Sequence, residues 1–317
     1  MEKDYKLKLN KEQLKAVEHM DGPCLVLAGA GSGKTRVLTE RIVNLINNGV
    51  SPNNILAITF TNKAANEMRE RVRIRIGEVS YKIFIGTFHS FGLRVLRENY
   101  EALGYQKNIN ILDRDDMNSI IKKQIKELNF ENEKYDYRYV VDKISSAKND
   151  EVSPEEFSKL FLSDYDYGID KIYANYQKIL KKNNSVDFDD LLTLPLELFD
   201  KRKDILDNYQ EHYKYILVDE YQDTNKIQYK LCKMLSNKYK NIFVVGDIDQ
   251  SIFSWRKADY ENILLFEKDY KDTRTIFLEE NYRSTNNILK VANSVIKNNT
   301  MRKEKNLWSS KGDGEKV

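Results

Sequence analysis

The sequence predicts an α/β fold with a parallel sheet and a helical subdomain inserted into it. Short, continuous apolar runs such as 55–60 and 215–218 alternate with stretches of helical apolar spacing. Strands of this kind are typical of a parallel sheet that is covered by helices on both faces. Between about 109 and 186 the apolar residues recur at helical spacing, and no buried strand pattern is present. This region is therefore expected to be a helical insertion.

The expected elements follow one another in a regular order. Strands are predicted at 25–28, 55–60, 83–88, 215–218, 241–245 and 275–278. Helices are predicted at 37–46, 62–71 and 286–296, and within the insertion at 117–128 and 169–180. The segment 301–317 is polar and contains glycines, and no regular element is expected there.

Length and composition are those of an ordinary globular protein. The 317 residues are enough for one or two domains with a full core, and 41% are hydrophobic and 32% charged. No run of eighteen apolar residues and no N-terminal apolar segment is present, so neither a membrane span nor a secretory signal is expected. Two cysteines, Cys24 and Cys232, are too few for a disulfide framework or a zinc site, which favours a reducing cytoplasm. The net charge of +3 neither requires nor excludes a nucleic-acid partner.

A glycine-rich loop joins the first expected strand to the first expected helix. The loop consists of Gly29, Ala30, Gly31, Ser32, Gly33, Lys34 and Thr35. Glycines let backbone N–H groups turn toward phosphate oxygens, and the following helix N-terminus favours negative charge. Lys34 is expected at the β- and γ-phosphates of ATP, and the Thr35 hydroxyl at Mg²⁺. Ala28 stands where the strict pattern has glycine; the alternative interpretation is a connector with a chance Lys-Thr pair.

Two carboxylates, Asp219 and Glu220, end the apolar strand 215–218. Asp219 is expected to hold Mg²⁺, directly or through water, and Glu220 to orient and deprotonate the attacking water. Alone, the pair also fits a solvated turn after a strand. Together with the phosphate loop it predicts a nucleotide-hydrolysing site.

Eight segments occur in an order that resembles superfamily 1A DNA helicases of the UvrD/Rep/PcrA type. They are LNKEQLKAV around Gln13, AGAGSGKTR at 28–36, TFTNKAANEM at 59–68, GTFHSFG at 86–92, DFDDLL at 187–192, VDEYQDT at 218–224, VVGDIDQSIFSWRKAD at 244–259 and LEENYRST at 278–285. The resemblance extends from about 9 to 308. RecB-like and AddA-like nuclease-helicases are similar too, and they are the alternative within this class.

The resemblance implies a domain organisation. It implies a RecA-like P-loop motor domain at 1–108 and 187–276, the helical insertion at 109–186, and the start of a second RecA-like domain at 277–317. Nothing resembles the family's later motifs V and VI, so the chain is expected to be a fragment whose second motor domain is missing in cis.

The resemblance also assigns roles at the nucleotide. Gln13 would read the adenine edge, because an amide both donates and accepts hydrogen bonds. Tyr282 would stack on adenine, and Arg36 would lie near the base or the phosphates. Gln250 would sense the γ-phosphate, and Arg283 would be an arginine finger that stabilises charge on the transferring phosphoryl group.

A second set would contact single-stranded or forked DNA. Aromatic stacking suits a motor because every base has a π-face, so binding tolerates any sequence. The stacking residues implied are Phe60, Phe253 and Trp255, and the residues implied to touch the strand are Thr61, Asn62 and His89. Without the resemblance, Phe60 also reads as a core residue and His89 as a structural histidine.

The function implied is an ATP- and Mg²⁺-dependent DNA helicase or translocase that steps 3′→5′ on single-stranded DNA, in repair or replication. Two interpretations from other classes stay open. One is a small-molecule phosphotransferase with the same loop, which leaves VDEYQDT and DQSIFSWR unexplained. The other is a module that binds ATP and DNA with little turnover.

Overall fold

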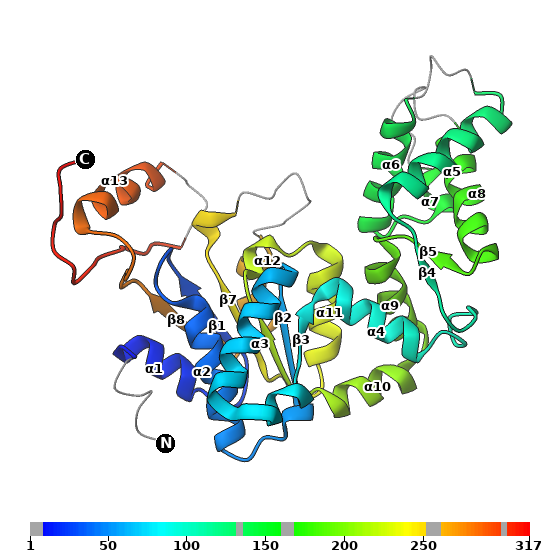
Figure 1. The fold of residues 1–317 in the computed structure, drawn as a ribbon. Coiled ribbons are helices and arrows are strands. Elements are labelled where there is room, and N and C mark those ends of the chain that lie inside the picture. The colour runs from blue at the N-terminus through cyan, green and yellow to red at the C-terminus, as the bar shows by residue number, and fades with distance from the viewer. Residues whose placement is uncertain (1–8, 131–135, 160–167, 252–260, 299–302) are drawn as a thin grey trace. The chain divides into compact units, whose positions relative to one another are not determined.

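The structure is a computed structural model, and it describes residues 9–130, 136–159, 168–251, 261–298 and 303–317 (Figure 1). The chain forms two compact units. Unit 1 contains residues 1–87, 206–225 and 232–317, and unit 2 contains residues 88–205 and 226–231.

A six-stranded parallel sheet is the centre of unit 1. Its order is β3-β2-β6-β7-β1-β8. The strands are β1 (Cys24–Ala28), β2 (Ile55–Thr59), β3 (Phe84–Thr87), β6 (Tyr215–Val218), β7 (Ile242–Gly246) and β8 (Arg274–Leu278). In register, Leu25 of β1 lies beside Val244 on one side and Thr275 on the other. The parallel sheet predicted from the apolar runs is confirmed, and each strand lies within two residues of its predicted bounds.

Both faces of this sheet are buried, which explains why the strands read as continuous apolar runs. On one face, Val26, Leu217 and Phe243 belong to a core that includes Leu38 of α2 and Met68 of α3. The neighbouring residues along β6 and β7 point to the opposite face of the sheet, and they are buried as well. Figure 1 shows α2 and α3 lying across the strands.

The helices of unit 1 begin and end where the sequence provides signals. They are α1 (Lys11–Glu18), α2 (Lys34–Asn47), α3 (Asn62–Ile76), α12 (Glu261–Asp269) and α13 (Asn286–Ile296). Asn10 and Gln13 form a capping box at the start of α1, and the Thr61 hydroxyl accepts from the backbone N–H of Ala64 at the start of α3. Two further helices, α10 (Lys203–His212) and α11 (Lys226–Ser236), run from one unit into the other.

Unit 2 is mainly helical. Its helices are α4 (Phe88–Glu98), α5 (Arg114–Glu127), α6 (Tyr137–Asn149), α7 (Pro154–Phe157), α8 (Ile169–Lys182) and α9 (Asp190–Lys201). Ile121, Ile144 and Tyr176 lie in a core formed by α5, α6 and α8. The helical character predicted for the insertion agrees with this core.

The expectation that the insertion contains no strand was wrong. Two two-residue strands, β4 (Asn110–Ile111) and β5 (Ser185–Val186), pair in parallel close to the predicted ends of the insertion. Strands this short carry no alternation that a sequence pattern can reveal.

The domain boundaries proposed from the resemblance stay a prediction. The compact units group 88–108 and 187–205 with the helical residues between them. The strand expected to begin a second motor domain, β8, is hydrogen-bonded to β1 in the same sheet. Among the described residues, no helix is both long and apolar enough to cross a bilayer.

Candidate functional site

The carboxyl ends of the parallel strands bring most of the predicted nucleotide residues to one edge of the unit 1 sheet. The phosphate loop follows β1, the acidic pair follows β6, and Asp247 follows β7. Open α/β sheets bind ligands at this edge, because the loops that leave neighbouring parallel strands all open there.

The phosphate loop is a tight turn between β1 and α2. Gly31 and Gly33 have φ of +68° and +89°, a region that side chains other than glycine rarely adopt. The Ser32 hydroxyl donates to the Gly29 carbonyl oxygen at 2.7 Å and closes the turn. Ala28 is the last residue of β1 and lies outside the positive-φ region, so its departure from the strict motif costs the loop nothing. Lys34 begins α2 and Thr35 follows it, as the motif requires.

Gln13 is buried against this loop. Its Nε2 donates to the Ser32 carbonyl oxygen at 2.8 Å, and its Oε1 accepts from the backbone N–H of Asn10 at 3.1 Å. Asn10 Nδ2 in turn donates to the Tyr282 hydroxyl at 2.9 Å. The two residues that the resemblance assigns to adenine, Gln13 and Tyr282, are therefore linked through Asn10, while Arg36 lies half-buried on the first turn of α2.

Lys34 and the acidic pair meet directly. Lys34 Nζ donates to Glu220 Oε2 at 2.7 Å. Asp219 is only 5% exposed, and burial together with the neighbouring Glu220 raises the pKa of its carboxyl to about 7. Glu220 has a left-handed backbone, with φ of +49°, which is unusual for a residue with a side chain. This strained position holds its carboxylate at the phosphate-loop lysine.

Gln222 connects the acidic pair to the turn after β7. Its Nε2 donates to Glu220 Oε2 at 2.9 Å, and its Oε1 accepts from the backbone N–H of Asp247 at 2.9 Å. Gln250, at the end of a short 3-10 turn, donates from Nε2 to Asp247 Oδ2. The predicted γ-phosphate sensor is thus joined to the predicted base through Asp247 and Gln222.

The donor set fits magnesium. Thr35 and Asp219 supply a hydroxyl and a carboxylate, which are hard oxygen ligands, and Mg²⁺ usually takes one or two carboxylates with substrate phosphates and water. Within the described part of the chain, no group of three or more histidine, cysteine or acidic side chains could hold a metal without such help.

The segment after β8 lies against the phosphate loop. Asn281 Nδ2 donates to the Ala30 carbonyl oxygen at 2.5 Å, and the Tyr282 backbone N–H donates to the Gly31 carbonyl oxygen at 2.9 Å. Arg283 is exposed, and its Cβ lies 2.8 Å from where a side chain on Gly31 would begin. The predicted arginine finger therefore begins beside the loop.

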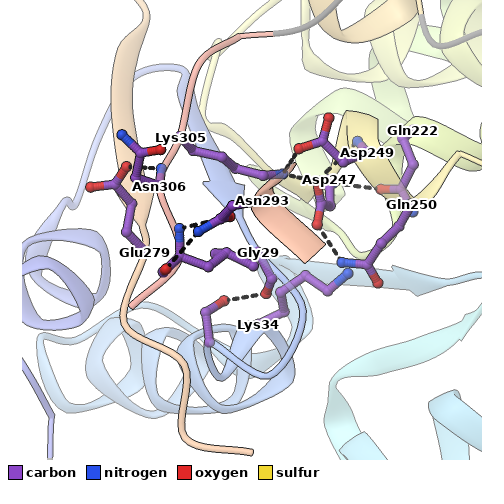
Figure 2. A network of polar contacts seen from close by, with 12 residues as sticks. Gly29, Lys34, Gln222, Asp247, Asp249, Gln250, Glu279, Asn293, Lys305 and Asn306 are labelled. Carbon is purple, nitrogen blue, oxygen red and sulfur yellow. Dashed lines mark hydrogen bonds and ion pairs between the residues drawn. The ribbon is translucent and has the colours of Figure 1, made fainter. Parts of the chain in front are cut away.

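Lys305 and Leu307 also lie at this site, and nothing in the sequence pattern indicates it. Figure 2 shows Lys305 in contact with Asp247 and with Asp249, the latter at 3.2 Å. Leu307 packs on Gly29, and Asn293 Nδ2 of α13 donates to the Leu307 carbonyl oxygen at 2.9 Å. These contacts join segments distant in sequence, and no motif marks them.

The predicted DNA residues of unit 1 surround the carboxyl end of β2. Phe60 is half-buried, whereas Thr61 and Asn62 are exposed at the start of α3. The Thr61 hydroxyl accepts a hydrogen bond as the helix cap, and its O–H can still donate to a phosphate oxygen. Phe253 and Trp255 lie outside the described residues.

His89 belongs to unit 2, at the first turn of α4. It stacks on Phe188, with 4.1 Å between ring centroids and 25° between ring planes. Burial lowers the pKa of the His89 imidazole to about 4, so the ring is neutral at physiological pH. Phe188, 58% exposed, was not singled out as a site residue. Its position between two aspartates in DFDDLL was the available signal, because a large aromatic flanked by charges is seldom a core residue.

Family models match almost the whole chain. The model of the UvrD/REP helicase N-terminal domain matches residues 9–271. The chain belongs to the UvrD/REP helicase family. A second model, of the UvrD-like helicase C-terminal domain, matches residues 276–317. The family resemblance inferred from the ordered segments is thereby confirmed.

Individual relatives in the UvrD/REP helicase family carry the same signal. The ATP-dependent DNA helicase PcrA of Bacillus subtilis (strain 168) is 53% identical over 310 residues, which are 98% of this chain and 42% of that protein. The ATP-dependent DNA helicase PcrA of Staphylococcus aureus (strain Mu50) is 48% identical over the same share of each chain. The chain therefore spans about 42% of the length of these helicases.

Proposed function

We propose that this chain is the ATP-binding part of a DNA helicase or translocase motor that steps 3′→5′ on single-stranded DNA, in repair or replication. The relatives named above are ATP-dependent DNA helicases. The observation that carries the proposal is the 2.7 Å contact between Lys34 of the phosphate loop and Glu220 of the acidic pair. That contact places a phosphate-binding cation and a candidate general base at one point of the sheet edge.

In this arrangement Lys34 and Glu220 neutralise each other. When the β- and γ-phosphates of ATP engage Lys34, the Glu220 carboxylate is released to accept the proton of the attacking water. Gln222 keeps Glu220 in place through its Nε2 donation, and Gln250 is positioned from the neighbouring turn to contact the γ-phosphate. Bound Mg²⁺, held by Thr35 and Asp219, would neutralise charge on the phosphates.

DNA contact is proposed for two groups of residues. In unit 1 the exposed Thr61 and Asn62, with Phe60 beside them, present a helix N-terminus, where backbone N–H groups favour a DNA phosphate. In unit 2 the neutral His89 and the exposed Phe188 form a ring pair on which a base can stack. Phe253 and Trp255 remain proposed stacking residues on the basis of the resemblance alone.

Two alternative functions assign the same nucleotide and DNA sites to a different kind of protein. The chain could serve a RecB-like or AddA-like nuclease-helicase, which would need a nuclease domain in the same protein or complex. It could also act by itself as an ATP- and DNA-binding module with little turnover. A cytoplasmic location without membrane attachment is proposed from the composition and from the bacterial relatives.

ATP hydrolysis with and without single-stranded DNA tests the proposal. We expect a strong increase in turnover when an oligonucleotide is added to the helicase that contains these residues. Glu220→Gln should reduce that turnover by a factor of about 10² to 10⁴, since a positioned general base contributes that much, while ATP still binds. Asp204→Asn, an exposed carboxylate paired with Arg202, is the matched control and should change neither quantity.

Equal turnover in Glu220→Gln and the parent would show that the base is wrongly assigned. An ATP turnover rate that is unchanged by DNA but requires a small acceptor molecule would indicate a phosphotransferase instead.

A further inference from the structure

A buried ion cluster lies behind the His89–Phe188 ring pair in unit 2. Lys148 Nζ, at the end of α6, contacts Asp187 Oδ2 at 2.6 Å and Asp190 Oδ1 at 2.7 Å. The Tyr176 hydroxyl donates to Asp187 Oδ2 at 2.9 Å. The side chain of Lys148 is 2% exposed and those of the two aspartates 4%. The nucleotide site described above uses none of these groups.

The single ammonium is essential to the charge balance of this cluster. Burial alone lowers the pKa of the Lys148 ammonium, but the carboxylates of Asp190 and Asp187 outweigh that effect and raise the pKa above its ordinary value. Lys148 is therefore charged. Without it, two carboxylates would face each other in a buried site, and such an uncompensated charge is strongly unfavourable. The two carboxylates would then have to share a proton or move toward water, and either change removes the contacts that fix this segment.

That segment presents Phe188. Asp187 and Asp190 also exchange backbone hydrogen bonds, with the Asp187 N–H donating to Asp190 Oδ2 at 3.1 Å and the Asp190 N–H to Asp187 Oδ1 at 3.0 Å. Asn149, the residue after Lys148, donates from Nδ2 to Asp189 Oδ1 at 2.9 Å. Each of the three acidic residues is thus held by the end of α6 or by another acidic residue. Phe188 is the residue of this turn that projects outward, onto the His89 ring.

We propose that Lys148 is a positioning residue for DNA binding. By neutralising Asp187 and Asp190 it fixes the turn that holds Phe188 against His89, so that the ring pair is already formed when a base arrives. The inference rests on the proposed function in one respect, namely that the ring pair contacts DNA. It adds that a buried lysine of the helical insertion, which touches no DNA, sets the geometry of that contact. Pre-forming the pair lowers the ordering cost that DNA binding would otherwise carry.

A purely structural role for Lys148 predicts a different result. In that case any comparable loss of stability in α6 would act in the same way. Ile144 lies one turn earlier on the same helix and is fully buried in the apolar core of unit 2. Ile144→Ala therefore destabilises this helix but removes no charge and no hydrogen bond from the ion cluster, and it is the matched control.

The first measurement observes the ring pair itself. The protein contains three histidines, His19, His89 and His212, so the imidazole Hε1 resonances of the whole chain can be assigned with single substitutions. The Phe188 ring shifts the His89 resonance, and Phe188→Leu defines its position without the stack. We expect Lys148→Met to move the His89 resonance to that position and Ile144→Ala to leave it unchanged. An unmoved resonance in Lys148→Met overturns the proposal.

The second measurement is the affinity for a short single-stranded oligonucleotide. We expect Lys148→Met and Phe188→Leu each to weaken binding about tenfold, within the range for losing one stacked base, and the double variant to be no weaker than either. Ile144→Ala should bind like the parent. If Lys148→Met loses the ring pair but binds as tightly as the parent, the link to DNA is wrong. If the parent itself does not bind the oligonucleotide, the proposed function fails, while the histidine resonances still decide the role of Lys148.

A milder variant covers the case in which Lys148→Met does not fold. Tyr176→Phe removes one hydrogen bond to Asp187 and keeps the ring and the ion pairs. We expect a smaller movement of the His89 resonance in the same direction. No movement in Tyr176→Phe, in a chain where Phe188→Leu gives a clear one, counts against the cluster as the positioning element.

Discussion

Asp219 and Glu220 are adjacent in sequence but lie in different surroundings. Asp219 is buried, and the pKa of its carboxyl is raised to about 7. The side chain of Glu220 is 35% exposed and pairs with Lys34. Two carboxylates in two environments can take two roles, and those proposed above are metal binding for Asp219 and proton acceptance for Glu220. The sequence identifies both residues, but only the folded chain shows that a left-handed backbone at Glu220 separates their directions.

His89 provides a test of burial at the residue scale. Its folded-state pKa is lowered from 6.5 to about 4 by burial, so below pH 6.5 the unfolded chain binds a proton that the folded chain does not. The free energy of unfolding should therefore fall as the pH decreases from 6.5 toward 4. His89→Phe keeps a ring against Phe188 and removes the titration.

We expect the difference in unfolding free energy between the parent and His89→Phe to change by up to about 2 kcal/mol between pH 7 and pH 5. Urea unfolding at the two pH values measures it. Comparing the two proteins at each pH cancels the contributions of all other titrating groups. A constant difference would mean that the imidazole of His89 is accessible to protons in the folded protein.

At the scale of elements, the sequence predicts what is local and periodic. The six strands of the main sheet were predicted because each is a run of apolar residues buried on both faces. The pair β4–β5 was not, because two residues per strand carry no period. The phosphate loop and the acidic pair were likewise predictable as contiguous motifs. The approach of Lys305 to Asp247 depends on packing between distant segments and leaves no pattern in the sequence. The exposure of Phe188 has only a weak local sign, the aspartate on either side of it.

The contact between α4 and α9 depends on one glycine. Pro195 lies inside α9 and has no N–H to donate to the Leu191 carbonyl oxygen four residues earlier. That oxygen faces Gly92 of α4, where a Cβ would come within 1.7 Å of it. Because the obstacle is a backbone atom, a side chain at residue 92 would force the two helices apart.

We expect Gly92→Ala to lower the unfolding free energy of the protein by about 1–3 kcal/mol, as overpacking of a tight contact usually does. His89 lies on α4 and Phe188 just before α9, so the same change should also separate their rings. Urea unfolding and the His89 resonance measure the two effects. Arg94→Ala, at an exposed ion pair on α4, is the control and should change neither. An unchanged unfolding free energy in Gly92→Ala would show that α4 and α9 can accommodate a methyl group at residue 92.

At the scale of the whole molecule, the activity expected of these residues depends on how much of a complete helicase they include. The 317 residues correspond to 42% of the length of the PcrA helicases and contain Lys34, Asp219, Glu220 and Gln250 at one sheet edge. Arg283 begins beside the phosphate loop and is exposed. The resemblance assigns a second arginine to motif VI, which has no counterpart among these residues. Phosphoryl transfer relies on such cations to stabilise charge in the transition state.

We therefore expect a polypeptide of these 317 residues alone to bind ATP but to hydrolyse it roughly 10³-fold more slowly than a complete motor, the lower part of the range for an arginine finger, and not to unwind DNA. The comparison is a longer polypeptide in which the C-terminal part of Bacillus subtilis PcrA follows these residues, at saturating ATP and single-stranded DNA. Lys34→Ala in both polypeptides is the control, since it should abolish ATP binding in each. Equal turnover by the short and the long polypeptide would show that the residues at this sheet edge suffice for hydrolysis, and that a second arginine is not required.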